Sequence, residues 1–192
     1  MAALVDHFES RLGRLIGAWS ASEQSPEGSP QVGYFAGGAL EGVQSYATIG
    51  LHNRHLTPRT SSRAQHLELL GCNRPVPGEK YGPFPGVLEF VAEHLVVSEE
   101  AVLRGEVIPL PRPLTPEGSL TALYAAVPVY FDDDFASVAL ENKTDVSIVW
   151  LVPISDAERG FVETKGWQAF ESELVRQDPD LLDLSRESMI LH

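Results

Sequence analysis

The sequence has 192 residues, of which 43% are hydrophobic and 21% are charged. These values are close to globular averages and exclude a disordered or fibrous chain, and the length suits one domain with a sizeable core. Asp and Glu number 27 against 14 Lys and Arg, which gives a formal net charge of -13. Because this charge repels phosphate backbones and anionic lipid, we expect no direct binding of nucleic acid or membranes.

Cys72 is the only cysteine of the chain. A single cysteine excludes an intramolecular disulfide and a multi-cysteine zinc site, and it suits a reducing compartment. The first residues, MAALVDHFESRL, have neither the basic start nor the apolar run of a secretory signal, and no stretch reaches the roughly 18–20 apolar residues that cross a bilayer. We therefore expect a cytoplasmic protein, in which Cys72 is a small buried residue.

The N-terminal part contains apolar segments separated by turn residues. Apolar side chains recur every three or four positions between residues 3 and 19, which predicts an amphipathic helix over that range. Residues 20–30 are polar and contain proline and glycine, so we expect a loop. Aromatic, β-branched and aliphatic residues then predict three strands, over residues 32–37, 43–51 and 63–72. We expect these strands to be antiparallel neighbours.

The middle of the chain is rich in proline. Pro85 suits the first turn of a helix, which we predict over residues 87–100. Several prolines between residues 105 and 119 predict an extended loop. A strand is predicted over residues 120–130, where Pro128 requires an edge, a bulge or the strand end because proline cannot donate a ladder hydrogen bond.

Two further strand segments precede the C-terminal helices. Residues 136–142 are a candidate to pair with the preceding strand. Residues 146–154 are apolar on both faces, as expected of a central strand that is covered on each side. Ser155 and Glu158 have the S-x-x-E spacing of a capping box, which predicts that a helix begins directly after this strand.

The last part of the chain predicts two more helices. Gly166 ends or kinks the first, and an aromatic-rich face then recurs at helical spacing at Trp167, Phe170 and Leu174. Asp178 followed by Pro179 predicts the start of a short last helix over residues 180–185. We interpret the three tryptophans of the chain as core anchors, because each lies in an apolar stretch: Trp19, Trp150 and Trp167.

No arrangement of residues points to catalysis. The sequence lacks the nucleophile elbow G-x-S-x-G, the Walker A lysine and the dinucleotide fingerprint G-x-G-x-x-G. His52 and His55 would need further ligands to hold a metal, and none is indicated nearby. His66 and Glu68 share one face of a predicted strand, as a surface or cleft pair. We therefore predict no catalytic residue, no metal site and no cofactor.

An acidic run, Asp132, Asp133 and Asp134, occurs at a predicted turn. It lacks the D-x-[DN]-x-[DN]-G spacing and the distal glutamate of a calcium loop. Two interpretations stay open, namely a solvated turn and a contact with a basic protein partner. These aspartates are the partner-binding residues that we predict.

Four motifs of the chain match, in order, the segments of one known protein family. VGYFAGGALEGVQSYATIGL is similar to an early pair of strands that ends in T-x-G-L, here Thr48, Gly50 and Leu51. RAQHLELLGC is similar to the following strand with its E-L-L core, here Glu68, Leu69 and Leu70. VWLVPISDAERGFVETKGWQAFESEL resembles the strand, P-I turn and paired helices, and DLLDLSRES resembles the closing D-L-x-R segment, here Asp183, Leu184 and Arg186. In this order the four motifs resemble the suppressor of fused family, and the resemblance covers residues 30–190.

The resemblance implies an α+β (mixed α/β) fold, with a central, largely antiparallel β-sheet flanked by helices, in agreement with the predicted elements. We expect one domain over residues 1–192. Animal members of the family add a second domain and sequester a transcription factor, whereas stand-alone bacterial members resemble immunity proteins that neutralise toxins. The resemblance therefore implies a bacterial, non-catalytic protein-binding domain that covers and inhibits a partner toxin.

Two alternatives stay open. The chain could be a regulator that sequesters a transcription factor, which the identity of the captured partner would distinguish. It could also be a hydrolase or a small-molecule-binding domain that uses His66 and Glu68 in a cleft at the sheet edge. That alternative requires titrating groups that converge in a pocket.

Overall fold

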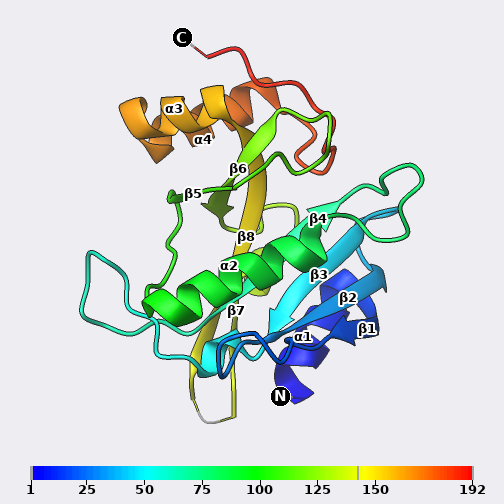
Figure 1. The fold of residues 1–192 in the computed structure, drawn as a ribbon, viewed down its shortest axis with the longest axis vertical. Helices are drawn as coiled ribbons and strands as arrows, with labels where there is room; N and C mark the ends of the chain where they lie inside the picture. The colour runs from blue at the N-terminus through cyan, green and yellow to red at the C-terminus, as the bar shows by residue number, and fades with distance from the viewer. Residues whose placement is uncertain (1, 142, 192) are drawn as a thin grey trace.

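The computed structural model describes residues 2–141 and 143–191, and its strands join in one sheet that runs through the molecule (Figure 1). The helices are α1 (Ala2–Leu12), α2 (Phe84–Ser98), α3 (Asp156–Lys165) and α4 (Trp167–Gln177). The strands are β1 (Gly13–Trp19), β2 (Gln31–Gly37), β3 (Gln44–Ile49), β4 (Leu67–Asn73), β5 (Val107–Pro109), β6 (Leu120–Ala126), β7 (Ser137–Ala139) and β8 (Asp145–Ser155). Two short 3-10 helices are η1 (Leu51–Asn53) and η2 (Asp133–Ala136).

The strand order is β1-β2-β3-β4-β8-β6-β5, and β7 pairs with the beginning of β8. All of these pairs are antiparallel except β4 with β8, which run parallel from Leu67 opposite Ser147 to Leu70 opposite Trp150. This order confirms the predicted α+β fold with a largely antiparallel sheet. It also confirms that the three strands predicted between residues 32 and 72 are antiparallel neighbours.

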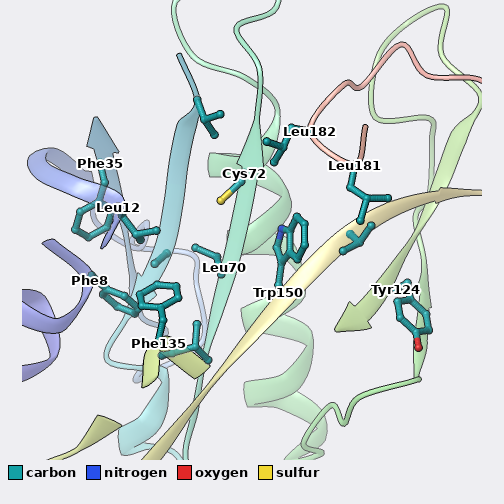
Figure 2. Packing of buried hydrophobic residues seen from close by; sticks show 14 of the residues in the cluster. Phe8, Leu12, Phe35, Leu70, Cys72, Tyr124, Phe135, Trp150, Leu181 and Leu182 are labelled. Carbon is teal, nitrogen blue, oxygen red and sulfur yellow. The ribbon is translucent and has the colours of Figure 1, made fainter. Parts of the chain in front are cut away.

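The sheet separates two apolar cores. The first core lies against α1, α3 and α4, and it takes alternate side chains of β8: Val146, Ile148, Trp150, Val152 and Ile154. The second core lies against α2 and takes the side chains between them, such as Val149 and Leu151. Figure 2 shows the first core, where Phe8 and Leu12 of α1 approach Phe35. Strand β8 is therefore covered on both faces, as its continuous apolar run predicted.

The N-terminal helix is shorter than predicted, because it ends at Leu12 and residues 13–19 form the edge strand β1. Gly13 has a φ of +87°, and a side chain there would overlap the carbonyl oxygen of Ala36 in β2. Glycine thus permits the sharp change from helix to strand. The expectation that Trp19 is a core anchor is also wrong, since 37% of its surface is exposed on this edge strand.

Three other predicted elements differ from the structure. Residues 137–139 pair with β8 and not with β6, and residue 142 of the predicted strand lies outside the described residues. Residues 107–109, expected in a loop, form β5 at the sheet edge. The predicted helix over residues 180–185 is absent. The Asp180 carboxylate accepts a hydrogen bond from the Leu182 N–H, and the Leu182 carbonyl oxygen accepts one from the Arg74 N–H. Such local side-chain bonds compete with helix formation.

Other boundaries agree with the sequence. Pro85 lies in the first turn of α2, and Pro128 lies beyond the end of β6. Trp150 is a buried core anchor as predicted, Trp167 is partly buried against the first core, and the thiol of Cys72 is fully buried. Among the described residues, no helix has the length and apolar character needed to cross a membrane.

Candidate functional site

The three aspartates predicted to contact a partner lie between β6 and β7. Asp132 precedes η2, and Asp133 and Asp134 form its first turn. The ring of Phe135 fixes this turn, because it is fully buried in the first core (Figure 2). The Arg11 guanidinium binds Asp132, with Nε 2.9 Å from Oδ2. All three aspartates are exposed to solvent, and the bond to Arg11 offsets part of the charge of Asp132.

Glu68 is a fully buried carboxylate of β4 that binds the turn after β3. Its Oε2 accepts from the Thr48 hydroxyl at 2.5 Å, and its Oε1 accepts from the backbone N–H of Gly50 at 2.8 Å. His52 adds its backbone N–H at 3.2 Å and its ring Nδ1 at 2.5 Å, both to Oε1. Gly50 has a φ of +112°, a conformation that glycine adopts without strain. Both oxygens of the Glu68 carboxylate therefore accept hydrogen bonds that hold the turn after β3 in place.

These contacts correct the expectation that His66 and Glu68 form a surface or cleft pair. Glu68 is 0% exposed, and the Nδ1 of His66 lies 2.7 Å from the backbone carbonyl oxygen of His52. The side chain of His52 is buried against Glu68 while that of His55 is exposed, so the two histidines do not converge. Within residues 2–141 and 143–191, no group of three or more His, Cys, Asp or Glu side chains could hold a metal ion.

A second buried carboxylate joins the start of α3 to the closing segment of the chain. Ser155 and Glu158 form the predicted capping box, with reciprocal bonds of 3.2 Å and 2.8 Å. Arg186 binds both oxygens of Glu158, Nη1 to Oε1 at 2.7 Å and Nη2 to Oε2 at 2.8 Å. Burial acts to raise the pKa of Glu158, yet the hydrogen bonds and charge of Arg186 outweigh it, so that the pKa lies below its ordinary value.

A cavity of about 260 Å³ lies between β6, β8 and α4. Apolar and aromatic side chains form most of its wall: Tyr124, Ala126, Tyr130, Trp150, Val152 and Leu174. The cavity reaches the molecular surface, because two lining residues, Val129 and Val175, are 63% and 83% exposed. Figure 2 shows two of its aromatic residues, Trp150 on β8 and Tyr124 on β6.

Three polar side chains of the cavity wall bind one another. Glu171 of α4 accepts from Arg104, whose Nε lies 2.9 Å from Oε1, and a second guanidinium nitrogen binds Oε2. The Tyr124 hydroxyl donates to Oε1 at 2.9 Å. Burial and this bond to a carboxylate raise the pKa of Tyr124 well above its ordinary value, so the hydroxyl stays protonated. These three side chains form one internally neutral group, and Tyr130 and Asp178 add a hydroxyl and a carboxylate to an otherwise largely apolar wall.

Comparison with protein families matches residues 30–187 to the family described as Suppressor of fused protein (SUFU). The chain belongs to the SUFU family. A SUFU homologue from Neisseria gonorrhoeae has a similar fold, with a TM-score of 0.75 and 16% identity over 100% of this chain and 97% of the homologue. Comparison with curated protein sequences gives no match.

Two further solved structures of Suppressor of fused proteins are also similar. The crystal structure of the Sufu–Fu complex gives a TM-score of 0.72 at 14% identity, covering 97% of this chain and 91% of the matched chain. Drosophila Suppressor of Fused gives 0.68 at 14% identity, covering 97% of this chain and 50% of that protein. At these identities the likeness shows the SUFU fold alone.

The motif residues of this SUFU domain meet in the two buried networks. Thr48 and Gly50 of T-x-G-L bind Glu68 of E-L-L, and Arg186 of D-L-x-R binds Glu158. The sequence did not predict the cavity at α4, because its wall comes from segments that are far apart in the chain. One feature of the sequence did point to a surface site at α4: Val175 is apolar but lies outside the predicted stripe of Trp167, Phe170 and Leu174.

Proposed function

We propose that this chain is a non-catalytic, protein-binding SUFU domain of the stand-alone bacterial type, which sequesters and inhibits a partner toxin. The observation that carries the proposal is the fold, which corresponds over nearly its whole length to the bacterial SUFU homologue. The Drosophila protein, by contrast, extends over about twice the matched length. We further propose that residues 1–192 act as one domain, and that the protein acts in the cytoplasm, which suits the single, buried cysteine.

The position of the ionisable groups supports binding without turnover. Glu68 and Glu158, both fully buried, are held by several donors each, and neither faces the cavity at α4. Among the described residues two carboxylates line the cavity, Glu171 and Asp178, and Glu171 is paired with Arg104 and Tyr124. A general base or nucleophile needs a free, converging partner.

The charge supports a basic partner. The chain carries a net -13, and Asp133 and Asp134 extend from a turn that a buried phenylalanine holds in place. We propose that the aspartates Asp132, Asp133 and Asp134 contact cationic side chains of the partner, within an interface near the usual ~800 Å² per protein. Complementary charge of this kind increases the association rate and selects partners.

The proposal is tested by capturing partners from native cell extract with the immobilised chain at low and moderate salt, followed by mass spectrometry. A captured polypeptide that stops growth when expressed alone, and whose effect this chain reverses when co-expressed, is the expected result. Capture of a transcription factor would replace immunity by the regulatory function. A captured toxin that remains active in a stoichiometric complex would contradict inhibition, as would a reproducible failure to bind toxins encoded by the same cell.

A further inference from the structure

We propose that the cavity between β6, β8 and α4 binds an apolar side chain of the partner protein, and that a basic residue next to it in the partner faces Asp178. This inference rests on the proposed function for the existence of a protein partner. It adds a second contact region, which is defined by the cavity residues and does not include the aspartates at η2. The occupant is a short exposed segment that carries an aromatic or large aliphatic residue beside an arginine or lysine.

The size and wall of the cavity suit one apolar side chain. Its volume of about 260 Å³ exceeds the roughly 150 Å³ that accommodates benzene in an apolar protein cavity. Three aromatic residues, Tyr124, Tyr130 and Trp150, contribute to the wall, and aromatic pairs gain energy beyond the area that they bury. Anchors that dominate protein interfaces are commonly single aromatic or aliphatic residues in such pockets.

The rim of the cavity carries apolar side chains that the fold leaves in solvent. Val175 of α4 and Val129, which follows β6, are among the most exposed large apolar residues, at 83% and 63%. They come from segments that are far apart in the chain, and both line the same cavity. Exposed apolar groups around a concave site are typical of a protein interaction surface.

The charges at the cavity favour a basic partner residue beside the apolar side chain that enters it. Arg104 and Glu171 neutralise each other, which leaves the carboxylate of Asp178 as the lining charge without an ion pair among the described residues. Asp178 caps the end of α4 in the left-handed conformation, and its backbone N–H donates to the Leu174 carbonyl oxygen at 2.9 Å, so the helix end holds its backbone at the cavity rim. A carboxylate at an apolar rim favours a cationic neighbour over an anionic one.

The experiment is an NMR titration of the ¹⁵N-labelled full chain with three capped dipeptide amides, N-acetyl-Phe-Arg, N-acetyl-Phe-Glu and N-acetyl-Ala-Arg. We expect amide shifts for Phe-Arg that are concentrated in β6, β8 and α4. Loss of the aromatic ring should weaken binding about tenfold, or about 1.4 kcal/mol, because less apolar surface is then buried in the cavity. Replacing Arg by Glu should weaken it about two- to fivefold.

Two matched pairs of variants locate the contact. Val175→Gln should weaken Phe-Arg binding about threefold, whereas Val97→Gln, at a 71% exposed valine on α2, should leave it unchanged. Asp178→Asn should remove the preference for Arg over Glu, and asparagine tolerates the left-handed backbone of this position. Asp6→Asn on α1 is its control. Thermal unfolding of each variant checks that the fold is retained.

The inference fails if Phe-Arg gives no localised shifts at millimolar concentration, if its shifts map outside the cavity, or if Phe-Glu binds equally well. It also fails if a concentration-dependent dimer is lost in Val175→Gln, because a second copy would then be the occupant. If Val175→Gln retains a captured toxin at wild-type affinity, this inference falls while the proposed function stands. If the dipeptides bind as expected and no toxin is inhibited, the proposed function falls and the site stands.

Discussion

Glu158 and Arg186 form a buried, two-bonded ion pair that connects the first turn of α3 to the closing segment of the chain. Their nitrogen–oxygen distances are 2.7 Å and 2.8 Å, and neither side chain is more than 6% exposed. Arg186 also donates to the Pro153 carbonyl oxygen at 2.9 Å, and the backbone of Met189 donates to Glu158 at 3.0 Å. This polar centre holds the segment after α4 against the start of α3 and the end of β8, although the segment forms no helix of its own.

Removal of the guanidinium should destabilise the protein strongly. We expect Arg186→Ala to lower the free energy of unfolding by about 3–5 kcal/mol, because a buried carboxylate loses its partner. Arg176→Ala is the matched control, since Arg176 forms an exposed pair with Glu173 whose loss should cost less than about 1 kcal/mol. Urea denaturation followed by circular dichroism gives both values. Equal effects of the two substitutions would show that the buried pair contributes little.

The same pair predicts a loss of stability in acid. The pKa of Glu158 lies below its ordinary value of 4.5 in the folded state, so the folded chain binds fewer protons than the unfolded chain. The stabilisation is complete above the unfolded pKa and is lost as the pH falls through the folded pKa. Unfolding free energies at pH 7, 5 and 3.5 should fall less steeply in Glu158→Gln than in the wild type. Parallel curves would assign the acid sensitivity to other carboxylates.

The Thr48 hydroxyl should stabilise the fold without taking part in partner binding. It donates to Glu68 at 2.5 Å and accepts from the backbone N–H of Leu69 at 2.8 Å. Thr48→Val keeps the shape of the side chain but removes one hydrogen bond each from the Glu68 carboxylate and the Leu69 N–H. We expect this loss to lower the free energy of unfolding by about 1–3 kcal/mol. The exposed Thr60→Val is the control. A variant that keeps its stability and loses the partner would give this network a direct binding role.

Charge reversal at the acidic turn should weaken partner binding while the fold is retained. The double variant Asp133→Lys and Asp134→Lys should raise the Kd about three- to tenfold, mainly through slower association, because each exposed charge contributes about 0.2–1 kcal/mol. The double variant Glu23→Lys and Glu27→Lys changes the net charge equally at the exposed loop before β2. Surface plasmon resonance at two salt concentrations compares them. Equal losses would show a net-charge effect with no local contact.

The thiol of Cys72 should be inert in the folded protein. Burial raises its pKa to about 12, although a hydrogen bond of its Sγ to the Ser45 hydroxyl, at 3.5 Å, acts in the other direction. We expect no reaction with Ellman's reagent at pH 8, and rapid, stoichiometric reaction in denaturant, because only the thiolate is nucleophilic. Rapid modification of the native chain would show that β4 opens frequently.

The local sequence determined those elements whose signals lie within a few residues. The apolar run 146–154 predicts a strand covered on both faces, and Ser155 with Glu158 predicts the helix start that the structure has. Pro85 likewise marks the beginning of α2. In each case the side-chain periodicity or the capping bond acts inside one element, so no distant residue was needed.

The tertiary structure alone decided the ends of the chain and the candidate sites. Residues 13–19 have helical periodicity, yet they form a strand that pairs with β2. The positive φ of Gly13 permits the change of chain direction that this pairing requires. Arg186 and Glu158 are 28 positions apart, and the cavity wall combines β6, β8 and α4. Such groups meet only after the sheet has assembled, because burial and pairing across the chain outweigh local preference. The sequence alone therefore indicated the family and the fold, while the geometry of the binding surface depended on long-range packing.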